Sequence, residues 1–232
     1  MKRIILTLTL AAAPLMSQAA EFNVEIHNPT RGLYYTPLLV AAHTPDQALF
    51  EPGGTATNEL QAMAEGGDIA PLVTTLGATG ATIVANPAGG LLAPGATTTA
   101  TVNTDNATAN THLSIVAMLL PTNDGFLALN NLEVPTQPGT YTYNLNAYDA
   151  GTEANDELRG SGAPGQPGMP VPPPLDPILG TNGTGAASAA EGYVHIHRGN
   201  LGDTDVNAGN SDIVSTLHRW LNPVTRVTIT VN

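Results

Sequence analysis

The strongest constraint on the fold is an apolar run, HLSIVAMLL, at residues 112–120. Between 113 and 120 only Ser114 is polar, so a strand here needs cover on both faces and belongs at the centre of a sheet. Pro121 ends this strand because proline has no N–H to donate, and the next residues, Thr-Asn-Asp-Gly at 122–125, have the composition of a tight turn. We therefore expect Asp124 on a rigid rim.

A second expected strand delivers two more carboxylates where it ends. Apolar and polar residues alternate from 141 to 147, and the chain then turns through YDAGTE at 148–153, which carries Asp149 and Glu153. Calcium prefers six to eight hard oxygen ligands, and β-sandwiches hold it with carboxylates from neighbouring loops at one end. The two turns therefore favour a hard cation such as Ca²⁺ near these acids. The alternative is that these acids only form turns.

The rest of the pattern predicts an all-β fold, an antiparallel β-sandwich with one or two short helices. Residues 22–28 alternate with period two and predict a first strand, and 224–231 predict a last strand that pairs near it. Residues 33–43 have β character with Pro37 inside them, which indicates an edge or a bulge. Short β-like runs occur at 81–85 and 97–104. Residues 57–65 have helical spacing, with Thr57 as the cap and glycines after the end.

The amino terminus predicts export. Residues 1–20 have a basic start, an apolar run and small residues before an expected cleavage site, which is the pattern of a signal peptide. We expect a single mature domain at 21–232, secreted or periplasmic, without a membrane span. After cleavage five arginines face 19 acidic residues, and this charge argues against nucleic acid as a partner. The absence of cysteine excludes thiol catalysis.

Three segments resemble a known family. MLLPTNDGFLAL and YDAGTE are similar to two signature segments of the spondin amino-terminal domain, in the same order and separation. EGYVHIHRGN with WLNPVTRVTITV resembles the end of bacterial members. The resemblance implies a C2-like sandwich and a bound Ca²⁺ whose ligands are Asp124, Asp149 and Glu153. By ungapped counting it also implies Asp105 as a further ligand. Animal members are matrix proteins of adhesion and recognition, but they carry cysteines and further modules.

From these features we expect a non-catalytic adhesion or ligand-binding module whose partner is an unknown protein or glycan. One alternative is a structural subunit of a surface layer or filament, which would self-associate. A weaker alternative is a hydrolase that uses Asp124 with Asp149 or Glu153. Aromatic residues that stack on sugars are scarce, with one Trp and six Tyr, and no nucleophile motif is present.

Two further segments carry expectations of their own. Residues 160–190 are dominated by Gly, Pro, Ala and Ser and contain too few large apolar residues for a core of their own, which predicts a mobile insertion. His195 and His197 lie two apart on an expected strand, so both face the same way and are able to chelate a transition metal such as Zn²⁺ with a third ligand. The simpler interpretation is a polar outer face opposite Val194 and Ile196.

Overall fold

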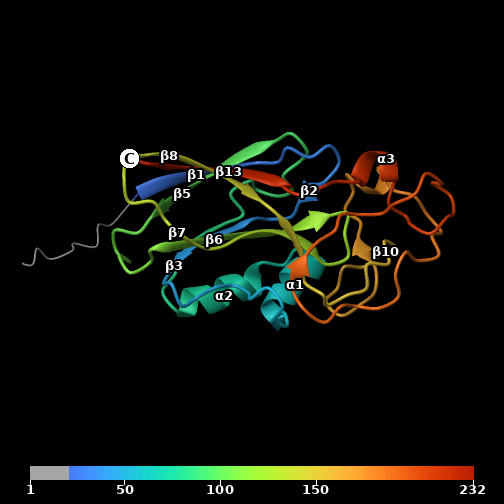
Figure 1. The fold of residues 1–232 in the computed structure, drawn as a ribbon, viewed down its shortest axis with the longest axis horizontal. Coiled ribbons are helices and arrows are strands. Elements are labelled where there is room, and N and C mark those ends of the chain that lie inside the picture. The colour runs from blue at the N-terminus through green and yellow to red at the C-terminus, as the bar shows by residue number, and fades with distance from the viewer. Residues whose placement is uncertain (1–20) are drawn as a thin grey trace, which may run out of the picture.

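The computed structural model describes residues 21–232, so the predicted signal peptide lies outside the described residues. Two antiparallel sheets face each other, as the all-β prediction requires (Figure 1). The four-stranded sheet has the order β5 (Thr97–Asn103), β1 (Glu21–His27), β13 (Thr225–Val231) and β8 (Gly139–Leu145). The seven-stranded sheet has the order β12 (His195–Ile196), β9 (Ala147–Asp149), β7 (Gly125–Glu133), β6 (His112–Leu120), β3 (Leu39–His43) and β4 (Thr82–Ala85), with β2 (Tyr34–Tyr35) paired to β6.

The strand β6 is central, as its sequence predicts. It pairs with β3 on one side and β7 on the other. Its odd-numbered apolar residues, such as Ile115, enter the core between the two sheets. Its even-numbered ones, such as Met118, enter a second core on the outer face of the larger sheet. Because each fully buried large apolar side chain contributes about 1.5–3 kcal/mol, β6 stabilises both cores.

The second core is covered by two helices. Helix α1 (Asn58–Gly66) begins where predicted, with the Thr57 hydroxyl accepting from the Leu60 N–H at 3.2 Å, and ends at Gly67 in the left-handed conformation. Helix α2 (Ala70–Ala78) was not among the predicted elements. The predicted strand at 33–43 is divided into β2 and β3 on either side of Pro37. Both strands pair with β6, and one extra residue is inserted between them, so Pro37 lies at a bulge, which was one of the two predicted alternatives.

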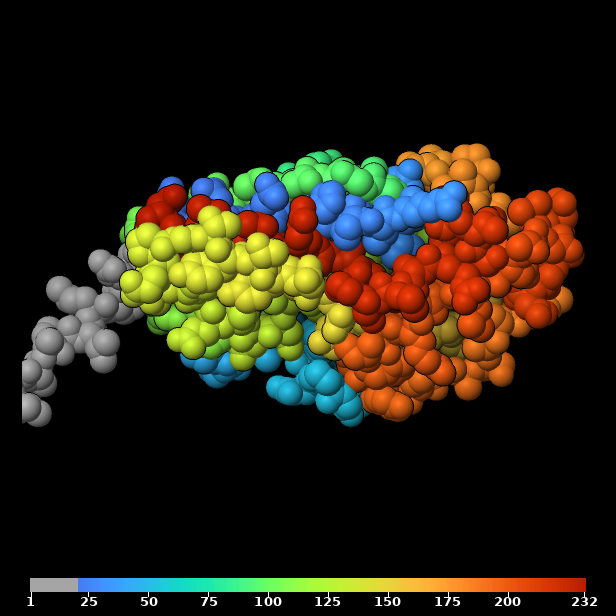
Figure 2. Space-filling model, turned by 45° about the horizontal axis from the view of Figure 1, so that its top comes forward, coloured from blue at the N-terminus to red at the C-terminus, as the bar shows by residue number. Residues whose placement is uncertain are grey.

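Residues 150–223, which we call the cap, lie together at one end of the sandwich, opposite the carboxyl terminus (Figures 1 and 2). The cap has little regular structure: β10 (Arg159–Gly160), β11 (Met169–Pro170), the 3₁₀ helix η1 (Asp176–Ile178), β12, which joins the larger sheet, and α3 (Ser215–His218). Buried carboxylates hold many of its backbone N–H groups. Glu157, for example, accepts from the N–H groups of Leu201 and Gly202 at 2.6 and 2.8 Å.

Residues 160–190 form no core of their own, but they join the second core of the sandwich. Met169, Leu175 and Leu179 are buried there beside the helices. Three well-spaced apolar side chains are enough to attach a segment to an existing core, and the mobility of the segment stays a prediction. The segment is also tied to α1, where Glu65 accepts from the Gly165 N–H at 2.5 Å.

We expect limited proteolysis with a broad-specificity protease to cut first at 163–167, which is exposed. Glu65→Gln should speed this cut about tenfold, because a lost hydrogen bond to a charged group is worth about 1.5–3 kcal/mol. The Gln61 amide donates to the other oxygen of Glu65. The substitution turns one of the two oxygens into an NH₂ group, so either the Gln61 amide or the Gly165 N–H loses its acceptor. Glu59→Gln in the same helix is the control. First cleavage outside the cap, or equal rates for both variants, would contradict this prediction.

Candidate functional site

Strand register brings the two predicted acidic turns together at the cap end of the larger sheet. Gly125 of β7 pairs with Asp149 of β9, so the turn that holds Asp124 lies beside the turn that follows Asp149. The Ala150 N–H donates to the Asp124 carbonyl at 3.2 Å, which fixes the two turns to each other. The sequence predicted this proximity, and the structure places both acids in the protein interior, with no more than 1% of either residue exposed.

One oxygen of the Asp124 carboxyl is held by the neighbouring turn. Oδ2 accepts from the backbone N–H groups of Thr152 and Glu153 at 2.8 and 3.1 Å. Oδ1 is buried and has no hydrogen-bond partner within residues 21–232. Burial, followed by the charge of Asp149, raises the pKa of Asp124 to about 8, although the two N–H groups lower it. A buried oxygen without a partner and with a carboxylate nearby favours a cation at this position.

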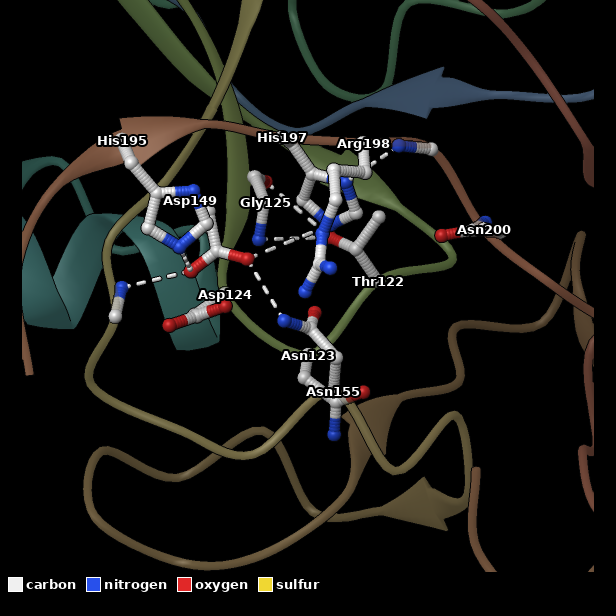
Figure 3. A network of polar contacts seen from close by, with 12 residues as sticks. Thr122, Asn123, Asp124, Gly125, Asp149, Asn155, His195, His197, Arg198 and Asn200 are labelled. Atoms are coloured by element: carbon white, nitrogen blue, oxygen red, sulfur yellow. Dashed lines mark hydrogen bonds and ion pairs between the residues drawn. The ribbon is translucent and has the colours of Figure 1, made fainter. Parts of the chain in front are cut away.

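Asp149 lies between two imidazole rings (Figure 3). Its Oδ1 accepts from the Gly151 N–H at 2.8 Å, and its Oδ2 accepts from the Asn155 amide at 2.7 Å. His195 Nε2 is 3.7 Å from Oδ1, and His197 Nε2 is 3.9 Å from Oδ2. Burial lowers the pKa of His197 to about 4, against the opposing effect of Asp149, so that ring is neutral at pH 7. The neutral His197 ring therefore supplies no positive charge to Asp149.

The Glu153 side chain is held by residues other than Asp149. Its Oε1 accepts from the Asn123 amide at 2.9 Å and from the Gly168 N–H. Its Oε2 is buried and lacks a hydrogen-bond partner in the part of the chain that the structure describes. Burial raises the pKa of this carboxyl. The charge of Glu153 also contributes to the raised pKa of Asp124. The three acids nevertheless do not offer one ligand atom each within 4.8 Å of the others.

Asp105 does not join this cluster. It is exposed in the turn after β5, where the Asn103 amide donates to it at 3.0 Å. The neighbouring Thr104 lines a pocket with Glu21 and Asn232, at the end of the sandwich opposite the cap. Strand β6 begins at this end and reaches Asp124 only after nine residues at about 3.3 Å each. Ungapped counting therefore placed the further ligand at a residue that the structure keeps apart from Asp124.

The structure adds Glu191, which the sequence did not single out. One ligand atom from each of Asp149, Glu191 and His195 lies within 4.8 Å of the others. Among residues 21–232, this is the only such group of three or more His, Cys, Asp or Glu side chains. Glu191 precedes Gly192 in a loop, and only the long-range pairing of β9 with β12 brings it to Asp149. Local sequence carries no signal for that contact.

A cleft of about 730 Å³ opens beside these acids. Its walls include Asp149, Glu191 and His197, together with Arg198, Arg219 and Trp220. The ring of Trp220 is 5.0 Å from that of His197, centroid to centroid. Two of the chain's few arginines therefore border an otherwise acidic site, where they are able to bind carboxylate or sulfate groups of a ligand.

Comparison with known proteins supports the resemblance. The sequence profile of the Spondin_N family, the spondin amino-terminal domain, matches residues 20–171. The matched range contains both signature turns and ends before Glu191 and the two histidines. No curated protein matches the chain. Within residues 21–232, no helix combines the length and apolar character needed to cross a bilayer.

Proposed function

The chain belongs to the spondin amino-terminal domain family, and on that premise we propose that it is an exported, non-catalytic binding module stabilised by Ca²⁺. The family supports an extracellular type of module. Asp124, Asp149 and Glu153 are the residues that we propose to hold the ion. The unknown protein or glycan ligand would bind at the cleft, where Trp220 offers a ring for stacking and the two arginines offer charged donors.

The observation that carries the calcium proposal is the unpartnered Asp124 Oδ1. Without a cation, ionising this buried carboxyl beside Asp149 is unfavourable, which is why its pKa rises to about 8. Hard carboxylate oxygens are the ligands that Ca²⁺ prefers. The unpartnered Oε2 of Glu153 supplies another oxygen of the same kind. A bound Ca²⁺ would satisfy the free oxygens and offset the mutual repulsion of the acids.

The test is the melting temperature in EDTA and in millimolar Ca²⁺. Extracellular modules bind Ca²⁺ with Kd of about 10⁻⁴–10⁻³ M. At about ten times Kd, linkage gives about 1.4 kcal/mol of stabilisation, or a shift of roughly 3–6 °C for a domain of this size. Asp124→Asn should remove this shift. In EDTA the same variant should melt at or above the wild-type temperature, because Asn keeps an oxygen for the two N–H groups and removes the buried charge.

Asp105→Asn is the matched control, since it removes an equal charge at the opposite end of the sandwich and should retain the full shift. Isothermal calorimetry gives a second measurement of binding. Equal melting temperatures in EDTA and Ca²⁺, together with no binding heat, would reject the calcium proposal.

A further inference from the structure

We propose a second cation site, formed by Asp149, Glu191 and His195, that takes a transition-metal ion of the Zn²⁺ class. It is distinct from the calcium proposal, with which it shares only Asp149. The three ligand atoms are Asp149 Oδ1, Glu191 Oε1 and His195 Nε2. Imidazole nitrogen is a ligand for Zn²⁺ and similar ions, whereas Ca²⁺ selects oxygen, so the chemistry of the set distinguishes the two sites.

The hydrogen bond of the His195 ring leaves its Nε2 free to bind a metal. Nδ1 lies 3.0 Å from the Ile196 carbonyl, which is only an acceptor, so Nδ1 carries the proton. In the neutral ring Nε2 then presents a lone pair toward Asp149 and Glu191. A backbone carbonyl that fixes the tautomer in this way is the usual outer partner of a metal-binding histidine.

The distances fit a shared ion better than direct hydrogen bonds. His195 Nε2 is 3.7 Å from Asp149 and 4.0 Å from Glu191, beyond the 2.7–3.2 Å range of such bonds. Two ligands about 2.1 Å from a tetrahedral Zn²⁺ lie about 3.4 Å apart, so small movements would complete the site. Buried His195 Nε2 and Glu191 Oε2 also lack hydrogen-bond partners among the described residues.

His197 supplies an independent observation. It is 5% exposed, and its Nε2 has no hydrogen-bond partner within residues 21–232 although it faces Asp149 Oδ2 at 3.9 Å. Its Nδ1 accepts from the Gly199 N–H at 2.9 Å, so in the neutral ring Nε2 carries the proton. His197 is therefore a positioning residue. Its Nε2–H points toward Asp149 Oδ2 (Figure 3), while Asp149 Oδ1 faces the proposed ion.

The position of the proposed metal site in the wall of the cleft indicates a role in ligand binding. Asp149 and Glu191 also line the cleft that Arg198, Arg219 and Trp220 border. Three protein ligands leave a fourth position of a tetrahedral ion for water or for an oxygen of a bound ligand. A metal here would anchor an anionic ligand at the wall of the cleft.

The experiment titrates the purified protein, treated with EDTA and dialysed, with Zn²⁺ in a calorimeter. We expect one ion per chain. Losing an outer-shell partner costs 10–100-fold in metal affinity, so losing a ligand in Glu191→Gln or His195→Gln should weaken binding about 100-fold or more. His27→Gln, on β1 of the other sheet, should bind as the wild type does. Circular dichroism and melting in EDTA confirm that each variant is folded.

Asp124→Asn separates the two proposals. The variant should lose the shift in melting temperature with Ca²⁺. It should keep its Zn²⁺ affinity within about threefold, because Asp124 is not among the three proposed Zn²⁺ ligands. A failed calcium titration in zinc-free buffer would overturn only the calcium proposal. No binding of stoichiometric Zn²⁺, or equal affinity in the wild type and both ligand variants, would overturn the second site and leave His195 as an ion-pair partner of Asp149.

Discussion

Replacing Gly151 by Ala is expected to lower the free energy of unfolding by about 2–5 kcal/mol. Gly151 has φ 67°, where an L-residue costs about 1–2 kcal/mol. An added Cβ would also lie 2.3 Å from the Tyr193 carbonyl oxygen and 2.6 Å from its nitrogen. Overpacking of this kind costs a further 1–3 kcal/mol. Denaturation in urea measures the loss.

Gly53→Ala is the matched control for this prediction. Gly53 has φ 85°, and an added Cβ would meet nothing within 4 Å, so only the backbone cost of about 1–2 kcal/mol applies. Because Tyr193 leads directly into β12, Gly151→Ala should also displace His195 and weaken the proposed Zn²⁺ binding. Equal losses of stability in the two variants would show that the contact with Tyr193 is not restrictive.

His218 is expected to make the protein sensitive to mild acid. The side chain is fully buried, and both of its ring nitrogens lack hydrogen-bond partners in the described range 21–232. Burial lowers its pKa from 6.5 to about 4. The unfolded chain therefore binds a proton at His218 near pH 6.5, whereas the folded protein binds it only near pH 4. Stability that is present above pH 6.5 is lost as the pH falls through this window, by at most about 3 kcal/mol.

His218→Leu tests this expectation by removing the titrating group and two unsatisfied nitrogens. The gain in stability over the wild type should be larger at pH 4.5 than at pH 7.5. Comparing the two proteins at each pH cancels Asp124, whose raised pKa acts in the opposite sense, and His197, whose lowered pKa acts in the same sense. A stability difference that does not change with pH would contradict a neutral buried His218.

The parts of the fold that local patterns control could be predicted from the sequence. β1, β6, β13 and α1 occur close to their expected ranges because each shows a clear period or a capping residue. Helix α2 was missed because its composition, with Thr and Gly, resembles that of the neighbouring loops. Pro71 in its first turn and Asp68, which accepts from the Ala70 N–H, were the available signals. The cap has no period to detect, since side-chain carboxylates replace much of its regular backbone pairing.

The candidate site divides in the same way. The adjacency of the turns that carry Asp124 and Asp149 could be predicted because each turn has its own composition, which is readable without knowledge of the fold. The role of these acids and of Glu153 as ligands stays a prediction. Glu191 and the cleft residue Trp220 reach Asp149 only through the distant segments that form β12 and the end of the cap. Asp105 was reached only by ungapped counting against the family, and the structure places it at the opposite end of the sandwich from Asp124.

The pairing of β1 with β13 determines when the protein is able to fold. β1 joins β5 to β13, and β13 also carries β8, so the four-stranded sheet is incomplete until residues 225–231 are in place. Tyr35 depends on the same segment, because its hydroxyl donates to the Val224 carbonyl at 2.6 Å. Contacts between such distant parts of a chain give a high contact order and slow folding, in milliseconds to seconds or longer. During synthesis, one edge of β1 is able to pair with β5 early, whereas its other edge stays unpaired until residues 225–231 follow.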